Sequence, residues 1–434
     1  MSARPSRRLL LLASKLGYQT RRFAETARGL GVEVIFGTDR CHRLDDPWCD
    51  AALPVPFERP AEAVARLLEA FNVQRPDGLL ALGDRPVLTA ALLAERLGLP
   101  GNPPAAAEIC RSKLRQREAL RAAGLRVPEF ASFPLEQDAT VISRLVRYPC
   151  VVKPLVLAAS QGVMRANDPE EFVTAARRLQ RLLESPEIAV LREPESRYLL
   201  VEDYIPGREV AVEGLLSAGR LRVLAIFDKP DPMEGPYFEE TIYVTPTRLP
   251  EHAQQALLDC CERTVRALGL FHGPLHAEFR INDSGVWPIE AAPRPIGGLC
   301  ARTLRFGPER IYLEELLVRH ALGLPGSELP RESDAAGVMM IPVPRSGLLE
   351  NVDGEQAARA VAGVEDLQIT ARLHDYIAAW PEGSSYLGFI FARGARPELV
   401  EAALREAHAR LQFRIVPRLP VEHPASGRLP ARAE

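Results

Sequence analysis

Cysteine is scarce in this chain and is not arranged for metal or disulfide chemistry. The 434 residues include seven cysteines, an odd number, and no two of them form a C-x-x-C pair. Cys260 and Cys261 are adjacent within a helical pattern. Disulfide frameworks and zinc sites need paired cysteines at characteristic spacings. We therefore expect ordinary thiols in a reducing compartment, which favours a cytoplasmic protein.

The chain also lacks a large charge of one sign and a long apolar run. Its formal net charge is −3, which gives no indication of a nucleic-acid partner or an anionic membrane surface. No stretch reaches the roughly 20 apolar residues that cross a bilayer. The arginines near the amino terminus are followed only by the short apolar run 9–13, which is too short for a signal peptide. We expect a full-length protein with no nucleic-acid or membrane partner.

No internal repeat or long low-complexity tract is present, so the length implies about three globular domains. Residues 1–105 alternate short apolar strands with amphipathic helices, which predicts a doubly wound parallel α/β domain. Residues 106–330 mix strands and helices and include a flexible lid at about 150–205. Residues 331–420 predict a small α+β domain. The proline-, alanine- and arginine-rich residues 421–434 predict a disordered tail.

The expected elements of the amino-terminal domain are strands at 9–13, 32–37 and 78–82 and helices at 20–30, 61–71 and 86–97. Further along the chain, strands are expected at 150–153, 198–203, 208–215, 338–343, 387–391 and 413–416, and helices at 169–184, 251–268, 308–322 and 398–411. The fold class is therefore α/β and α+β.

One strand–turn–strand pattern carries several charged residues. His276, Glu278 and Arg280 alternate with apolar residues and so share one face of a strand. Residues 283–285 suit a three-residue hairpin loop in which Gly285 supplies a positive φ. The pattern predicts a β-hairpin with a charged face.

The hairpin register brings two acids together. The three-residue loop sets Asn282 opposite Val286, and counting back places Glu278 opposite Glu290. Like charges directly across a strand pair are destabilising, so a shared proton, a nearby arginine or a metal ion must compensate. Paired carboxylates with few other ligands suit Mg²⁺. The alternative is a solvated polar face on which Arg280 neutralises both acids.

The segment Glu290-Ala-Ala-Pro-Arg294, followed by Pro295-Ile-Gly-Gly298, resembles the metal and catalytic segment of ATP-grasp enzymes, which usually reads Glu-x-Asn-x-Arg. Glu278, twelve residues earlier, matches the other metal-binding glutamate. The resemblance implies that Glu278 and Glu290 bind Mg²⁺ or Mn²⁺ and that Arg294 stabilises the oxyanion of a tetrahedral intermediate. Gly297 and Gly298 would let the backbone approach the substrate.

The rest of the ATP-grasp pattern appears in the expected order. Lys113 and Lys153, the latter in Val-Val-Lys-Pro, resemble the two lysines that contact the ATP phosphates. The small residues 158–163 resemble the phosphate-covering loop. The segment 201–209, Val-Glu-Asp-Tyr-Ile-Pro-Gly-Arg-Glu, resembles the adenine clamp. The nucleotide-binding residues implied by the resemblance are Lys113, Lys153, Ser160, Gln161, Gly162, Glu202, Asp203, Tyr204, Ile205 and Glu209.

Two further residues are candidates for contact with substrate or proton. His276 could accept the proton of an amine, with a structural role as the alternative. Glu213 shares a strand face with Glu209, so it joins Arg294, Gly297 and Gly298 among the substrate-lining candidates. Ala292 occupies the usual asparagine position of the metal segment, and alanine cannot bind a metal.

The carboxy-terminal section resembles that of bacterial L-amino acid ligases, which join unprotected amino acids. The resemblance implies an ATP-dependent carboxylate–amine ligase that works through an acyl phosphate, with small-molecule acid and amine substrates, in a cytoplasmic protein that forms a homodimer as related enzymes often do. The alternatives are another ATP-grasp chemistry, such as a purine-pathway ligation or formyl or carboxyl transfer, and a non-catalytic ATP-binding regulator.

Overall fold

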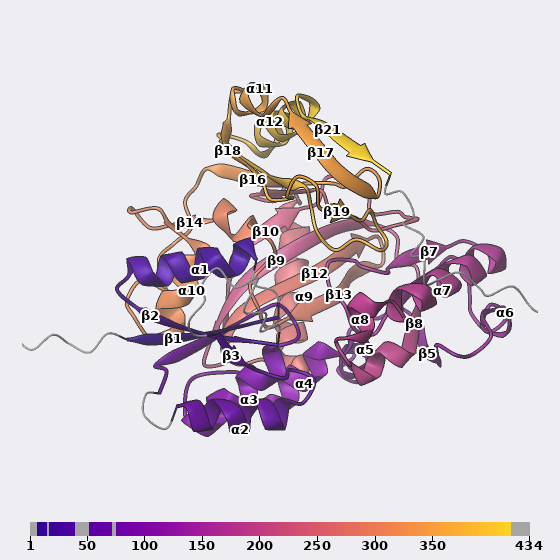
Figure 1. The fold of residues 1–434 in the computed structure, drawn as a ribbon, viewed down its shortest axis with the longest axis horizontal. Helices are drawn as coiled ribbons and strands as arrows, with labels where there is room; N and C mark the ends of the chain where they lie inside the picture. Colours follow the sequence, from indigo (N-terminus) through magenta and orange to yellow (C-terminus); the bar gives the residue numbers. More distant parts are fainter. Residues whose placement is uncertain (1–6, 15–16, 40–51, 72–74, 418–434) are drawn as a thin grey trace, which may run out of the picture.

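The structure is a computed structural model that describes residues 7–14, 17–39, 52–71 and 75–417. The segment expected to form a disordered tail, 421–434, lies outside the described residues. Figure 1 shows the amino-terminal unit at the lower left, a small helical and stranded lid at the right, and the carboxy-terminal unit above a large central sheet.

The amino-terminal unit is a parallel sheet with helices on both faces, as the alternating pattern predicts. The strands run in the order β3-β2-β1-β4, and all of the pairings are parallel. Leu9 and Leu11 pack on the side of α1, whereas Leu10 and Leu12 pack on the side of α2 and α3. The elements are β1 (Arg8–Ala13), α1 (Tyr18–Gly29), β2 (Glu33–Thr38), β3 (Ala52–Pro54), α2 (Pro60–Ala70), β4 (Gly78–Leu82) and α3 (Val87–Leu97).

The central sheet has eight antiparallel strands in the order β13-β12-β9-β10-β11-β16-β20-β18. Its strands are β9 (Arg208–Ser217), β10 (Arg220–Asp228), β11 (Ile242–Thr245), β12 (Gly273–Asn282), β13 (Gly285–Ala292), β16 (Ala335–Ile341), β18 (Val364–Ile369) and β20 (Gly388–Gly394). The last three of these come from the carboxy-terminal unit, so one sheet continues across residue 331.

One face of the central sheet packs on the long helix α9 (Glu251–Leu268). Val210 and Val212 of β9 and Ala277 and Phe279 of β12 are buried there against apolar residues of α9 such as Leu257. Because side chains alternate along a strand, the charged residues at the intervening positions point to the opposite face. The burial pattern thus separates an apolar structural face from a charged face.

The lid is a four-stranded antiparallel sheet in the order β5-β8-β6-β7. Its strands are β5 (Phe130–Pro134), β6 (Cys150–Pro154), β7 (Met164–Ala166) and β8 (Tyr198–Asp203), and its helices are α6 (Ala139–Ile142), α7 (Pro169–Leu183), α8 (Pro186–Ala189) and η1 (Pro194–Arg197). The Asp168 carboxylate caps α7 by accepting from two backbone N–H groups, which fixes where that helix begins. Two helices, α4 (Pro104–Arg111) and α5 (Lys113–Ala122), connect the amino-terminal unit to the lid.

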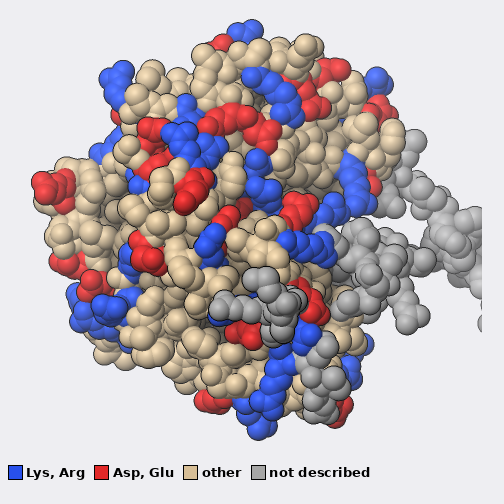
Figure 2. Space-filling view, turned by 90° about the vertical axis from the view of Figure 1, so that its left-hand side faces the viewer, with Lys and Arg blue, Asp and Glu red and all other residues tan. Residues whose placement is uncertain are grey.

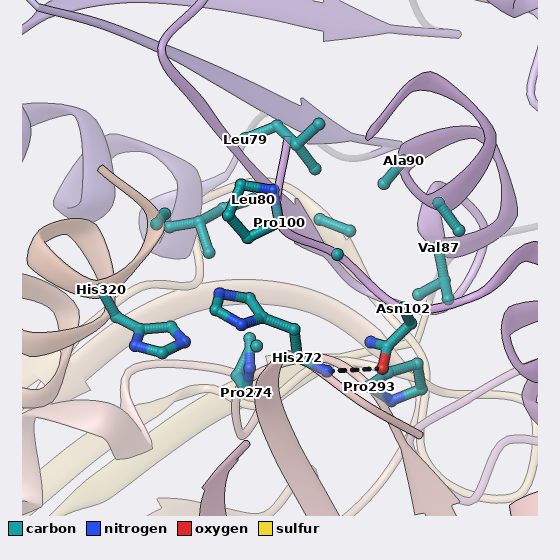
Figure 3. Close-up of a pocket in the computed structure, with 15 residues that line it drawn as sticks. Leu79, Leu80, Val87, Ala90, Pro100, Asn102, His272, Pro274, Pro293 and His320 are labelled. Atoms are coloured by element: carbon teal, nitrogen blue, oxygen red, sulfur yellow. Dashed lines mark hydrogen bonds between the residues drawn. The ribbon is translucent and has the colours of Figure 1, made fainter. Parts of the chain in front are cut away.

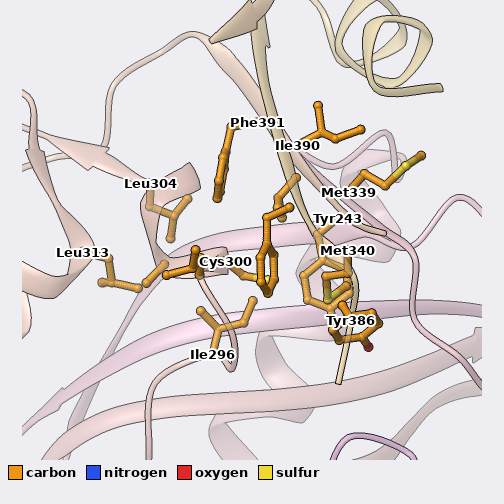
Figure 4. Packing of buried hydrophobic residues seen from close by; sticks show 14 of the residues in the cluster. Tyr243, Ile296, Cys300, Leu304, Leu313, Met339, Met340, Tyr386, Ile390 and Phe391 are labelled. Carbon is orange, nitrogen blue, oxygen red and sulfur yellow. The ribbon is translucent and has the colours of Figure 1, made fainter. Parts of the chain in front are cut away.

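The carboxy-terminal unit adds a second sheet, β19-β17-β21, over the central one. Its remaining elements are β17 (Gly347–Asp353), α11 (Glu355–Arg359), β19 (Tyr376–Ile377), α12 (Pro397–Ala409) and β21 (Gln412–Val416), and between the units lie η2 (Cys300–Thr303), β14 (Arg305–Phe306), β15 (Ile311–Tyr312) and α10 (Leu313–Ala321). Tyr243, Met340 and Tyr386 pack in one cluster with Cys300 and Ile296, which joins the units through a shared core (Figure 4).

The hairpin register differs from the expected one, although the two acids still face each other. Asn282 pairs with Gly285, so the loop has only two residues, and the expected pairing of Asn282 with Val286 is wrong. A bulge then inserts one extra residue in β13 next to Pro288 and restores the pairing of Glu278 with Glu290. Proline suits such a position because it has no N–H to donate to the ladder.

The charged surface agrees with the nearly neutral composition. On the face drawn in Figure 2, acidic and basic side chains are interspersed among uncharged ones. In the part of the chain that the structure describes, no helix has both the length and the apolarity needed to span a membrane.

Candidate active site

The charged face of the central sheet is built from cross-strand pairs. The register sets His276 opposite Glu213 and Arg280 opposite Glu209. Arg280 Nε donates to Glu209 at 2.8 Å, so this arginine is engaged with Glu209. The alternative in which Arg280 neutralises the two hairpin acids is therefore wrong. The compensation for Glu278 comes from other cations.

Lys229, directly after β10, is the main cation in this cluster. Its buried ammonium lies 2.8 Å from Glu209, 2.5 Å from Glu240 and 3.3 Å from a Glu278 oxygen. Burial alone would lower the pKa of Lys229, but the three carboxylates raise it well above its usual value. Burial has the opposite effect on a carboxyl group and raises the pKa of Glu240 to about 6, even with Lys229 beside it. Lys229 therefore holds together several acids that would otherwise repel one another.

The same carboxylates fit a divalent cation. Glu209, Glu240 and Glu278 each offer an oxygen within 4.8 Å of the others, and Glu290 lies across the hairpin from Glu278. An all-oxygen donor set of this kind suits Mg²⁺ or Mn²⁺ better than softer metals. The buried side chain at Ala292 is apolar, so it adds no ligand at the usual asparagine position. Glu278 is thus chemically suited to the metal role that the sequence implies, and the metal role of Glu290, which faces it across the hairpin, stays a prediction.

His276 sits between two acids. Its Nδ1 is hydrogen-bonded to Glu213 and its Nε2 lies 3.3 Å from Glu278. Burial works against the charged imidazole, but Glu213 and Glu278 outweigh it and raise the pKa of His276 to about 9. The imidazole therefore carries a proton at neutral pH and must lose it before it can act as a base. Its catalytic role stays a prediction.

Arg294 is brought to the cluster by the end of β13, and its main partner comes from the amino-terminal unit. Its Nε donates to Asp84 at 2.8 Å, and the side chains of Arg294 and Asp84 are 13% and 27% exposed. Burial would raise the pKa of Asp84, but Arg294 above all, then Lys113 and His276, lower it below its usual value. These charges therefore act on one another within a single site.

Asp84 and Lys229 were not predicted as site residues, although each has a signal in the sequence. Asp84 follows β4, and the carboxyl ends of parallel strands are where open α/β sheets commonly bind ligands. Lys229 follows an apolar strand and precedes a proline, as Lys153 does.

The lid contributes a second charged group around Lys153. Its ammonium donates to Glu202 at 2.6 Å, and Arg117 Nε lies 2.8 Å from the other oxygen of the same carboxylate. Burial lowers the pKa of Lys153 to about 8 despite Glu202. Burial would raise the pKa of Glu202, but Arg117 and Lys153 lower it to about 2. Glu202 is therefore engaged with two cations in this conformation.

The other clamp residues lie at the hinge between lid and central sheet. Arg280 donates to the Ile205 carbonyl, and Tyr204 N–H donates to the Pro149 carbonyl at 3.0 Å. Asp203 is different, because its partly exposed carboxylate pairs with Arg147 at 2.9 Å. The structure therefore keeps Asp203 away from the buried charges, and its nucleotide-binding role stays a prediction.

The phosphate-loop candidates and the glycine pair also have defined places. Lys113 at the start of α5 donates to the Leu157 carbonyl at 2.7 Å, which ties it to the loop that contains Ser160, Gln161 and Gly162. Gly297 and Gly298 follow Arg294 after Pro295 and Ile296. A Cβ at Gly298 would lie 2.8 Å from Phe389 and its φ is +63°, so only glycine fits there without strain.

Family comparisons match the three units of this fold in order. A model described as "ATP-grasp N-terminal domain" matches residues 24–101, "ATP-grasp domain" matches 146–303, and "L-amino acid ligase C-terminal domain 2" matches 339–416. The chain belongs to the ATP-grasp superfamily. The predicted family resemblance and the predicted fold class are confirmed.

Relatives of this ATP-grasp chain include amide-forming ligases. The crystal structure of the L-amino acid ligase from Bacillus licheniformis matches with a TM-score of 0.80 and 28% identity, covering 95% of this chain and 100% of that one. Carnosine synthase 1 from Gallus gallus is 32% identical over 302 residues, which are 65% of this chain and 31% of the relative. Alanine–anticapsin ligase from Bacillus subtilis is 26% identical over 260 residues, 56% of this chain and 52% of the relative. The chain thus spans about half the length of the last of these and under a third of carnosine synthase.

A small cavity lies between the amino-terminal unit and the start of β12, and Pro293, the residue before Arg294, is part of its lining. Its volume is about 50 Å³. His272 and His320 stack beside it with ring centroids 4.4 Å apart, and Asn102 accepts the His272 backbone N–H at 3.1 Å (Figure 3). Among the described residues, the buried Nε2 of His272 has no hydrogen-bond partner. This stacked histidine pair connects the start of β12 to α10 in the ATP-grasp chain.

The stacked pair of His272 and His320 leads us to expect that the folded protein loses stability on acidification. Burial, with His272 and Arg222 nearby, lowers the pKa of His320 to about 4. Because the folded pKa is below the unfolded value, the stabilisation is complete above pH ~6.5 and is lost as pH falls toward 4. Allowing for partial exposure, wild type should lose on the order of 2 kcal/mol more than His320→Gln between pH 7 and pH 4.5. Urea unfolding of both proteins at each pH measures the difference, and parallel losses would contradict this account.

Proposed function

We propose that this ATP-grasp protein is an ATP-dependent ligase that joins a carboxylate to an amine, with at least one partner an amino acid, and releases ADP and phosphate. The observation that carries the proposal is the facing pair Glu278 and Glu290, with Arg294, whose side chain is 13% exposed, close enough to act on both charges. Relatives that are named as L-amino acid, carnosine and alanine–anticapsin ligases support the same reaction class.

In the proposed reaction, the substrate carboxylate attacks the γ-phosphorus of ATP and forms an acyl phosphate and ADP. The amine then attacks the acyl carbon, its proton is lost, and phosphate leaves with the bridging oxygen. This is phosphoryl transfer governed by position and charge, so the residues must orient and neutralise more than react. Lys113 donates to the carbonyl of Leu157 in the loop 157–163, and Lys153 lies in β6, the strand before this loop. Both cationic side chains are therefore suited to neutralise the phosphate charge.

A divalent cation held by Glu278 and Glu290 would supply charge neutralisation at the phosphates. Arg294, the last residue of the metal segment, would donate to the oxyanion that develops when the amine attacks, and its hydrogen bond to Asp84 supports this role by orienting the guanidinium. Gly297 and Gly298 extend that surface with backbone free of side chains. Glu213 fixes His276 and accepts from the Ile296 N–H at 3.3 Å, which makes it an orienting group for the substrate segment.

The test is phosphate release from ATP and Mg²⁺ in the presence of paired pools of amino acids and small carboxylic acids. Release that requires both substrates, with a new amide mass, supports the ligase. Glu290→Gln should lose the product, while Asp283→Asn, on the exposed turn of the same hairpin, should retain it. Phosphate release with one substrate alone, or a product without an amide, would favour another ATP-grasp chemistry. ATP binding without turnover would favour a regulatory protein.

The buried lysine of the lid predicts a pH dependence of ATP use. The pKa of Lys153 is about 8, so the side chain is cationic below that pH and neutral above it. Because kcat/KM reports the free enzyme, kcat/KM for ATP should fall by about tenfold per pH unit above pH 8. Lys153→Arg should move this fall out of the measured range, since guanidinium stays charged. A profile that is flat to pH 10 in wild type would contradict the assignment.

A homodimer, a cytoplasmic location, and the absence of nucleic-acid and membrane partners stay predictions. Small-molecule acid and amine substrates fit the relatives, and the pools above are chosen to identify them.

A further inference from the structure

The loop proposed to cover the phosphates has an unusual backbone. Leu157, Ala159 and Ser160 all have positive φ, at 83°, 56° and 53°. Side chains other than glycine are strained in this region and stay there only where neighbouring structure holds them. The sequence of the loop therefore does not by itself explain its conformation, and its contacts must.

Those contacts come from the carboxy-terminal unit. We call residues 378–383, directly after β19, the latch segment. The indole N–H of Trp380 donates to the Ala159 carbonyl at 3.1 Å, and Trp380 is only 5% exposed. The Pro381 carbonyl accepts the Gly162 N–H at 2.8 Å. The Glu382 carbonyl accepts from the Gln161 side chain at 2.7 Å. Three consecutive latch residues thus hold the loop.

An ion pair reinforces the same contact. Arg178, on α7 of the lid, donates through two nitrogens to the two oxygens of Glu382, at 2.5 and 2.8 Å. A third nitrogen of Arg178 donates to the Tyr237 hydroxyl. The two-point geometry fixes direction as well as distance. The lid is therefore tied to a unit that lies more than 200 residues further along the chain.

The loop also connects to the charged site. On its other side Lys113 donates to the Leu157 carbonyl, and β6 with Lys153 leads directly into it. The latch segment thus sets the position of the loop relative to both lysines. An acyl phosphate is lost to water unless such a loop stays closed while the amine reacts.

We propose that Trp380 and Glu382 are positioning residues that hold the phosphate loop closed from the carboxy-terminal unit, so that the acyl phosphate reacts with the amine and not with water. This inference rests on the proposed ligase function and extends it. In the latched state, transfer of the acyl group to the amine releases phosphate and forms one amide for each ATP. In the unlatched state, water takes the place of the amine, and ATP is consumed while the free acid is regenerated.

The test compares Glu382→Gln and Trp380→Phe with wild type. The matched control is Glu398→Gln, an exposed acid of the same unit. We expect the ratio of phosphate to amide to be close to one in wild type and the control, and about tenfold higher in both latch variants. The KM for ATP should rise with it. The exchanged pair Arg178→Glu with Glu382→Arg should recover part of the coupling that either single change loses. Equal ratios and equal KM in folded latch variants would overturn the inference.

Binding of a non-hydrolysable ATP analogue separates this inference from the proposed function. Weaker analogue binding in the latch variants but not in Glu398→Gln supports the latch even if no amide forms with any substrate pool, an outcome that would reject the ligase alone. Amide formation with unchanged analogue affinity and unchanged ratio would reject the latch alone. Melting temperatures of all variants identify any that fail to fold, and for those the exchanged pair provides the comparison.

Discussion

Arg294→Met is expected to lower kcat by about 10²–10³-fold with a much smaller change in KM for ATP, because one donor to a developing oxyanion contributes about that much. The Arg294 side chain is largely buried, and its Nε lies 2.8 Å from a carboxylate oxygen of Asp84. A group that acts mainly in the transition state changes kcat and kcat/KM together. Steady-state amide formation with the acid–amine pair found in the pools measures both constants.

The control for this change must address Asp84, which methionine leaves without its partner. Arg294→Lys keeps the charge beside Asp84 but loses the planar donor geometry, so it should fold like wild type and still lose most of the activity. Asp84→Asn keeps Arg294 and should lose less activity than Arg294→Met does. Activity of Arg294→Met within a few-fold of wild type would remove Arg294 from the catalytic group.

Lys229→Met is expected to lower the free energy of unfolding by about 3–5 kcal/mol at pH 7.5, because it leaves several buried carboxylates without their shared cation. The deficit should shrink at pH 5, since Glu240, whose pKa is already about 6 beside Lys229, then takes up a proton. Urea unfolding at the two pH values measures both effects in the metal-free protein.

Two comparisons sharpen the lysine result. Lys229→Arg keeps the charge and should retain most of the stability. Added Mg²⁺ should stabilise Lys229→Met more than wild type, because a cation bound by the same carboxylates replaces the lost charge. A Lys229→Met protein as stable as wild type at pH 7.5 would show that the acids are not held by this ammonium.

Elements with a long, regular pattern were predictable from the sequence. The helix expected at 251–268 is α9, with the same bounds, and β8 spans the expected strand 198–203. The helix expected at 308–322 begins only at Leu313, because Ile311 and Tyr312 form the short strand β15, which pairs with β14. Three-dimensional pairing of short segments has no periodic signal that a single sequence could reveal.

The site shows the same division. Glu278 and Glu290 were paired correctly, although through a wrong loop and a compensating bulge that a residue count cannot detect. The pairing of Arg294 with Asp84 was out of reach, because it joins residues 210 positions apart across two units. Lys229 was detectable by the same strand–lysine–proline pattern that identified Lys153. A single sequence chiefly fails to show which charged residues, far apart along the chain, neutralise each other.

The central claim is that the chain activates a carboxylate as an acyl phosphate. The most direct measurement supplies the acid substrate with ¹⁸O in both carboxylate oxygens and follows the label by mass spectrometry of the released phosphate. The account predicts one ¹⁸O per phosphate, one ¹⁸O kept in the amide, and ADP as the other product. Unlabelled phosphate, or label found in AMP, would contradict it.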